Sequence, residues 1–307
     1  MPSSSAPRIA LAPENSPRWM ADAILAGGGR LVPVSGAEGL VWGTPARPAE
    51  LVATLDNAPD VRWVQLPYAG VERFLDVIDD DRTWTCGKGV YAEPVAELAI
   101  GFALALMRGI QFYSHATSWL APRGRNLLDG RVTILGGGGI TESLLRLLTP
   151  FGAHVTVVRN RVQAMDGADV VIESERLYEA LSGADVVVLA LALTAETEGI
   201  IGAGELELME RHAFLINVAR GKHVVTGDLV DALRDGTIAG AALDVTDPEP
   251  LPDGHPLWTL PNCLITPHVG NTPEMAEPLL AERITANVRR FAAGEPLIGL
   301  VDTDLGY

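Results

Sequence analysis

From Arg131 onward the chain alternates short apolar runs with helical stretches, and this alternation limits the fold more than any other feature of the sequence. Seven runs have the length and composition of strands, namely RVTIL, HVTVV, ADVVI, ADVVVLAL, AFLINV, AGAALDV and CLITP. Strands that alternate with helices predict parallel pairing, with crossover helices on both faces of one sheet. We therefore predict a doubly wound, parallel α/β domain in this part of the chain.

The first part of the chain shows the same alternation on a smaller scale. The apolar runs RIALA, RLVPV, LVWG and VRWVQL, with a helix near residues 19–26, predict a second, smaller α/β domain. Residues 95–119 predict a helix that joins the two domains, and residues 282–291 predict a final helix. At 307 residues the chain is long enough for two domains that each bury a core.

The charge and the cysteines exclude several classes of function. A formal net charge of −16 argues against binding to nucleic acid or to an anionic membrane, and the longest apolar run, residues 98–107, is too short to span a bilayer. An anionic substrate would need a local cluster of positive groups. Cys86 and Cys263 have no metal-ligand spacing, so no metal site is expected. Prolines interrupt the N-terminal segment, which lacks the apolar core of a signal peptide, so we expect a cytoplasmic protein.

A glycine turn lies where a dinucleotide-binding motif would be placed. The strand RVTIL runs directly into four glycines, and a helix is predicted from about residue 140 to 148. The glycines permit a tight turn and close backbone approach, so that the helix N-terminus faces a pyrophosphate. The third motif position is Thr141 instead of glycine. The candidate phosphate-binding residues are Gly136, Gly138, Gly139 and Ile140; the alternative is a flexible loop in an ordinary strand-to-helix connection.

The end of the next strand bears on which nicotinamide cofactor is used. In folds that bind NAD, a carboxylate about 20 residues beyond the first glycine accepts hydrogen bonds from the adenosine ribose. Here HVTVV ends in Arg159, Asn160 and Arg161. Two guanidinium groups and an amide suit a 2′-phosphate, so NADP is predicted to be preferred, with NAD as the second choice. The alternative is that the arginines only solvate a loop.

Three segments that follow later strands carry the candidate catalytic residues. They are NVARG, LDVTDPEPLP and LITPHVG, which contain Arg220, Glu249 and His268. Ligands of open α/β sheets bind beyond the carboxyl ends of the strands, so these side chains can converge. Arg220 can hold a carboxylate and a carbonyl oxygen with its planar fork of donors. His268 can exchange the hydroxyl proton, Glu249 can orient the imidazole, and a nicotinamide would supply the hydride.

Each catalytic candidate also has a structural interpretation. An arginine after a strand is often a surface charge, a glutamate between prolines is often part of a solvated loop, and a histidine in TPHVG can be a capping or packing residue. Their shared order after a glycine turn favours the catalytic interpretation.

The chain resembles the D-isomer-specific 2-hydroxyacid dehydrogenases, a family that includes glyoxylate/hydroxypyruvate reductases. The resemblance is dense from about residue 95 to 273, in EPVAELAIGFALALMR, VTILGGGGI, LTAETEGIIG, INVARGKHVV, AGAALDVTDPEPLPDGHPLW and LPNCLITPHVG. It is weaker before residue 95, where LPYAGVERF is similar to the family's substrate loop. Two departures, Thr141 for glycine and Ala192 for proline, fall in the cofactor cleft.

The resemblance implies a role for each candidate residue. Arg220 would polarise the substrate, His268 would be the acid/base and Glu249 its partner, while Asp244 would contact the nicotinamide amide. The substrate carboxylate would be bound by backbone donors of Tyr68, Ala69 and Gly70, together with Arg220 and His268. Further cofactor contacts would come from Leu191, Leu193, Thr197, Val218, Ala219 and Gly270.

The resemblance also implies the domain organisation and the activity. A substrate domain of flavodoxin-like fold would comprise residues 1–98 and 286–307, with a Rossmann-type dinucleotide-binding domain, residues 99–285, inserted into it. A homodimer formed through the cofactor domains is expected. The implied reaction is hydride transfer between NAD(P)H and a small 2-oxo acid of the glyoxylate or hydroxypyruvate type. The alternative is a catalytically silent NAD(P)-binding regulatory or scaffold protein of the same fold.

Overall fold

The computed structural model describes residues 6–302, and the chain divides into two compact units. Unit 2 runs from Ala92 to Asn271, and unit 1 contains the chain on either side of it. The predicted insertion of one domain into the other is therefore observed. The boundaries that we expected, after residues 98 and 285, fall inside two helices, α3 (Ala92–Met107) and α9 (Pro273–Ala293). A continuous helix packs as one rigid element, which moves both boundaries to the helix starts.

The sheet of unit 2 consists of seven parallel strands. Their order is β12-β11-β10-β9-β6-β7-β8, and all seven were predicted. The strands are β6 (Arg131–Leu135), β7 (His154–Val158), β8 (Val170–Ile172), β9 (Val186–Leu189), β10 (Phe214–Asn217), β11 (Gly240–Leu243) and β12 (Cys263–Ile265). The strand order reverses between β6 and β9, and ligands of such sheets bind at this switch point, beyond the carboxyl ends.

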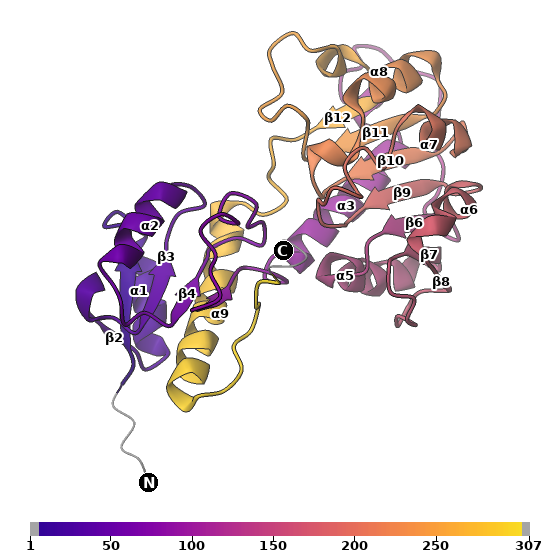
Figure 1. Ribbon diagram of the computed structural model, residues 1–307. Coiled ribbons are helices and arrows are strands. Elements are labelled where there is room, and N and C mark those ends of the chain that lie inside the picture. The colour runs from indigo at the N-terminus through magenta and orange to yellow at the C-terminus, as the bar shows by residue number, and fades with distance from the viewer. Residues whose placement is uncertain (1–5, 303–307) are drawn as a thin grey trace. The chain divides into compact units, whose positions relative to one another are not determined.

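Helices cover both faces of this sheet (Figure 1). Successive strand residues point to opposite faces, so Ile134 packs with Leu144 in one core while Leu135 packs with Leu181 in the other. The first core is closed by α3 and α5 (Gly139–Leu148), and the second by α6 (Leu177–Leu181), α7 (Ala203–Leu208) and α8 (Thr226–Asp235). Burial on both faces explains why the strands are continuous apolar runs.

Unit 1 has a smaller parallel sheet of flavodoxin-like order, β2-β1-β3-β4-β5. Its strands are β1 (Arg8–Ala12), β2 (Arg30–Leu31), β3 (Gly39–Trp42), β4 (Trp63–Gln65) and β5 (Thr83–Thr85), and its helices are α1 (Arg18–Ala26), α2 (Pro48–Asp56) and α9. The buried Asn287 of α9 donates to Oε1 of Gln65 at 2.8 Å, and Phe291 packs on Trp63. These contacts fix the last helix to this sheet.

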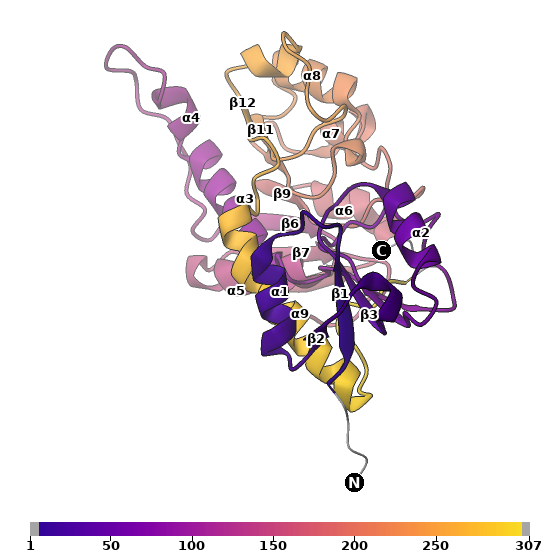
Figure 2. The ribbon, with the colours of Figure 1, turned by 90° about the vertical axis from the view of Figure 1, so that its left-hand side faces the viewer.

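Two helices differ from their predicted lengths. The helix predicted over residues 95–119 ends at Met107, because Gly109 adopts a left-handed conformation with φ +64°. A short helix, α4 (Ile110–Tyr113), and a loop follow it and project from the end of α3 (Figure 2). The final helix begins at Pro273, earlier than predicted, since proline is well suited to the first turn. Over residues 6–302, none of the helices has both the length and the apolar character of a membrane span.

Candidate active site

The glycine turn closes tightly on the loop after β9. Gly136 has φ +111°, and a Cβ built on it would lie 2.3 Å from the carbonyl oxygen of Ala190. Only glycine fits this position, because both the conformation and the space exclude a side chain. The turn after β6 and the loop after β9 are therefore in direct contact at the switch point of the sheet.

The start of α5 is open and lacks a protein cap. Gly138 is its N-cap residue, and no described atom lies within 4 Å of a Cβ built there. Among residues 6–302, no side chain caps the first N–H groups of α5. Unpaired N–H groups and the helix dipole favour an anion at this point. The turn therefore has the room and the donors that a dinucleotide pyrophosphate requires.

Thr141 replaces the third motif glycine without opening the turn. Its side chain is fully buried, and its hydroxyl donates to the carbonyl oxygen of Gly136 at 2.9 Å. A buried hydroxyl that keeps a partner costs little. Thr141 thus binds the helix to the turn.

Substituting Gly138 by alanine should weaken NADPH binding while sparing the fold. The added methyl group meets no described atom of the protein, so the free energy of unfolding should change by less than about 1 kcal/mol. The same methyl group would hold a phosphate away from the N–H groups of α5, so we expect the Kd of NADPH to rise roughly tenfold or more. Fluorescence titration measures this. Gly204→Ala in α7, where the space is also open, is the matched control and should leave the Kd unchanged.

Arg159 lies against the glycine turn. A Cβ built on Gly137 would lie 2.6 Å from Nε of Arg159, so this guanidinium and the turn share one surface. Asn160 accepts a hydrogen bond from the Ser174 hydroxyl at 2.5 Å, and Arg161 follows on the same exposed loop. Arg159, the first of the two arginines that were predicted to suit a 2′-phosphate, thus lies directly beside the turn.

The loop that carries His268 is organised by the buried carboxylate of Asp244. One oxygen accepts from the Thr266 hydroxyl at 2.6 Å and from the Val269 N–H at 2.8 Å, and the other accepts from the Gly270 N–H at 2.9 Å. The His268 N–H donates to the carbonyl oxygen of Asp244 at 2.8 Å. The observed role of Asp244 is to shape this loop; its contact with a nicotinamide amide stays a prediction.

This bonding holds His268 in an unusual backbone conformation. Its φ is +53°, a left-handed value that costs a residue with a Cβ on the order of 1–3 kcal/mol. The conformation turns the ring toward the loop after β11, where Nδ1 lies 2.7 Å from Oε1 of Glu249. Both side chains are about half exposed. A carboxylate on Nδ1 leaves Nε2 available to a substrate, which is the arrangement of a general acid and its orienting partner.

Arg220 stands on the neighbouring loop, after β10. A Cβ built on Gly221 would lie 2.0 Å from the Thr246 backbone, so this loop packs directly on the one that leads to Glu249. The buried Asn217 donates to the carbonyl oxygen of Arg220 at 2.8 Å and accepts from the Ala219 N–H at 3.0 Å. The structure therefore brings the loops of all three catalytic candidates together at one edge of the sheet.

Some predicted cofactor contacts have buried side chains. Val218 and Ala219 belong to the two cores of unit 2, so only their backbones can face a ligand. Thr197 donates from its hydroxyl to the carbonyl oxygen of Ala192 at 2.8 Å and shapes the loop after β9. Leu191 and Leu193 are half-buried in that loop.

The loop with Tyr68, Ala69 and Gly70 follows β4 in unit 1. Tyr91 donates its hydroxyl to the carbonyl oxygen of Pro67 at 2.6 Å, and burial raises the pKa of that hydroxyl, so it stays a donor. The loop is therefore fixed at its base. Donation by its backbone to a substrate carboxylate stays a prediction.

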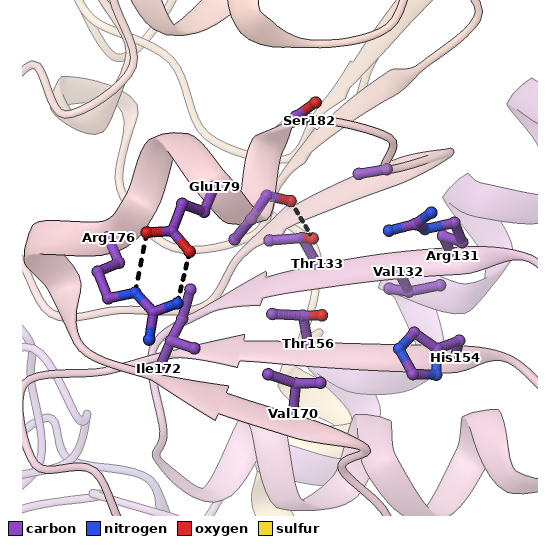
Figure 3. Close-up of a pocket in the computed structure, with 12 residues that line it drawn as sticks. Arg131, Val132, Thr133, His154, Thr156, Val170, Ile172, Arg176, Glu179 and Ser182 are labelled. Carbon is purple, nitrogen blue, oxygen red and sulfur yellow. Dashed lines mark hydrogen bonds and ion pairs between the residues drawn. The ribbon is translucent and has the colours of Figure 1, made fainter.

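A hollow of about 130 Å³ on the sheet of unit 2 is not lined by the glycine turn or by the loops of Arg220, Glu249 and His268 (Figure 3). It is lined by residues of β6, β7, β8 and α6, including Thr133, which donates to the Ala180 carbonyl oxygen, and the ion pair between Arg176 and Glu179. Thr133 thus bonds to the backbone of α6, and Arg176 and Glu179 bond to each other. The hollow therefore lacks the candidate catalytic and cofactor-binding residues, which follow the carboxyl ends of the strands.

Three polar residues that support the site were not singled out from the sequence. Asn217 and Thr266 hold the loops of Arg220 and His268, and His223 is fully buried three residues after Arg220. The signal that could have found them is their type: polar side chains within apolar runs at the ends of strands.

Comparison with known proteins agrees with this arrangement. The family model for the NAD binding domain of D-isomer specific 2-hydroxyacid dehydrogenases matches residues 100–270. The chain is 42% identical to a protein of the proB 3′ region of Corynebacterium melassecola, over 82% of this chain and 86% of that protein. It is 33% identical to glyoxylate/hydroxypyruvate reductase A of Serratia proteamaculans, over 70% and 69% of the two chains.

A solved structure extends the likeness to the whole chain. The D-isomer specific 2-hydroxyacid dehydrogenase of Xanthobacter autotrophicus Py2, in complex with NADPH and MES, superposes with a TM-score of 0.85 at 27% identity, over 99% of this chain and 100% of that one. The fold and the glycine turn define a dinucleotide-binding α/β protein. The chain belongs to the D-isomer specific 2-hydroxyacid dehydrogenases.

Proposed function

We propose that this protein reduces a small 2-oxo acid to the D-2-hydroxy acid and that it prefers NADPH to NADH. The observation that carries the proposal is the contact of 2.7 Å between His268 and Glu249, beside the loop of Arg220 and at the same sheet edge as the glycine turn. The names of the relatives support the substrate class, since several are glyoxylate/hydroxypyruvate reductases.

Each residue has a defined task in this proposal. The open start of α5 binds the pyrophosphate, and the bound nicotinamide supplies the hydride. Arg220 binds the carboxylate and polarises the ketone with its planar fork. His268 donates a proton from Nε2 to the developing hydroxyl, and Glu249 stabilises the imidazolium that precedes this donation.

Incubation of the purified protein with NADPH and a panel of 2-oxo acids tests the proposal. Glyoxylate and hydroxypyruvate should cause loss of nicotinamide absorbance, and larger or phosphorylated acids should react more slowly. Binding of NADPH without turnover on any acid would instead favour a regulatory or scaffold protein that keeps the fold.

The projecting arm, residues 109–128, supports a homodimer. It presents three exposed apolar side chains, Ile110, Trp119 and Leu128, and the exposed fraction of Trp119 is 102%. The arm is internally braced, since Arg123 stacks on Phe112 at 3.6 Å. A braced apolar arm fits a second copy of the chain, because its fixed shape can pack on an identical surface.

Sedimentation at micromolar concentration should therefore give the mass of two chains. Introducing Trp119→Asp together with Ile110→Asp should shift the protein toward the monomer, whereas Tyr178→Asp, at an exposed aromatic side chain on α6, should not. A monomeric wild type would exclude the dimer.

A cytoplasmic location also belongs to the proposal, and its support is that both cysteines are unpaired.

A further inference from the structure

His223 is the most completely buried titratable side chain near the site, and the proposed chemistry gives it no task. It lies in the short turn η4 (Gly221–His223), and its exposed fraction is 0%. Its ring contacts two separate segments. Nδ1 lies 3.2 Å from the backbone nitrogen and 3.0 Å from the carbonyl oxygen of Arg220, and Nε2 lies 3.2 Å from the carbonyl oxygen of Ala192. A buried polar ring with partners on both sides is a link between those segments.

The partners define the tautomer of the ring. Burial lowers the pKa of His223, so the imidazole is neutral and carries one N–H. Two carbonyl oxygens face the ring, that of Ala192 at 3.2 Å from Nε2 and that of Arg220 at 3.0 Å from Nδ1, and a neutral ring can donate to only one of them. A hydrogen on Nε2 gives both ring nitrogens a partner, whereas a hydrogen on Nδ1 would set the lone pair of Nε2 against the Ala192 oxygen. Nδ1 is then an acceptor for the Arg220 N–H, while the Arg220 carbonyl oxygen accepts from Asn217.

The two linked segments belong to different parts of the site. Ala192 follows Ala190, whose carbonyl oxygen touches the glycine turn at Gly136. Arg220 begins the turn that packs on the loop of Glu249. His223 therefore stands between the segment bordering the cofactor turn and the segment that carries the substrate-binding arginine.

We infer that His223 is a positioning residue that sets the Arg220 backbone and the Ala192 loop through two separate hydrogen bonds. This inference rests on the proposed function. The Nδ1 bond orients Arg220 toward the substrate, and the Nε2 bond holds the loop beside the glycine turn. The replacement of the family's proline by Ala192 does not remove the link, since both residues offer a carbonyl oxygen.

Two substitutions separate the bonds. Asn at this position keeps an acceptor near the place of Nδ1 and loses the donor to Ala192, whereas Gln keeps a donor near the place of Nε2 and loses the acceptor for Arg220. His223→Asn should raise the Kd of NADPH roughly five- to tenfold with little change in the KM of the 2-oxo acid. His223→Gln should raise that KM and lower kcat by a similar factor, with a near-normal Kd of NADPH.

The control is Thr133→Val, which removes a buried hydrogen bond from the same sheet at a distance from the site (Figure 3). It should lower the Tm without selectively changing the Kd of NADPH or the KM of the 2-oxo acid. If both His223 variants change the two constants in parallel, or change neither, the inference is wrong and His223 is only part of the core. Titration of NADPH needs no turnover, so a wild type that reduces no 2-oxo acid defeats the proposed function and still leaves the His223→Asn result decisive.

Discussion

Replacing His268 by alanine should lower kcat for 2-oxo acid reduction by about 10²-fold or more. The imidazole is the proton donor in this account, and its left-handed backbone and contact with Glu249 hold it ready for that task. Alanine removes the proton source and leaves the glycine turn and α5 intact. The Kd of NADPH should therefore stay within a factor of about two. Steady-state kinetics and fluorescence titration measure the two quantities.

Two further variants sharpen this prediction. Glu249→Gln should also lower kcat, because a neutral amide holds the His268 ring less firmly than the carboxylate does. His154→Ala, at an exposed histidine that begins β7, is the matched control and should keep near-normal turnover. Near-normal turnover in His268→Ala would remove this residue from the mechanism.

Arg159→Asp should remove the preference for NADPH. The guanidinium lies against Gly137 in the turn, and Arg161 follows on the same loop, so the wild type should favour NADPH over NADH by roughly one to three orders of magnitude in kcat/KM. An aspartate at the end of β7 repels a 2′-phosphate and can accept hydrogen bonds from the ribose hydroxyls of NADH. The ratio of kcat/KM values for the two cofactors should fall to one or below.

The control for this change is Arg211→Asp, which makes the same charge reversal at an exposed position. Arg211 lies just before the N-terminal end of β10, whereas Arg159 follows the C-terminal end of β7. It should leave the ratio of the kcat/KM values for NADPH and NADH unchanged, because the loss of preference depends on the position of Arg159 and not on the net charge of the protein. Equal use of both cofactors by the wild type would show that Arg159 and Arg161 only solvate their loop.

The parallel sheets were predictable because their strands are buried on both faces. Runs such as RVTIL and ADVVVLAL carry the apolar residues of both cores of unit 2, and the sequence identified all seven strands. The short strand β5 and the helix α2 escaped prediction, since a strand of three residues and a helix of nine residues leave little pattern. The early end of α3 depends on the left-handed conformation of Gly109, which sequence periodicity does not reveal.

The site was predictable in its chemistry but less so in its supports. Arg220, Glu249 and His268 stood out because each is a polar residue that follows a strand. The three donors on Asp244 and the link through His223 are contacts between segments distant in sequence, so no local pattern encodes them. The packing of Gly221 on Thr246 is also a contact between segments that are distant in sequence.

Following an isotope label from the cofactor to the product tests the proposed hydride transfer. Wild-type protein is supplied with NADPH deuterated at C4 of the nicotinamide on the transferred face and with hydroxypyruvate, and the product is analysed for label and configuration. We expect one D-2-hydroxy acid to be formed per NADPH consumed, with deuterium at C2. An L product, an unlabelled product, or consumption of NADPH without any hydroxy acid would contradict it.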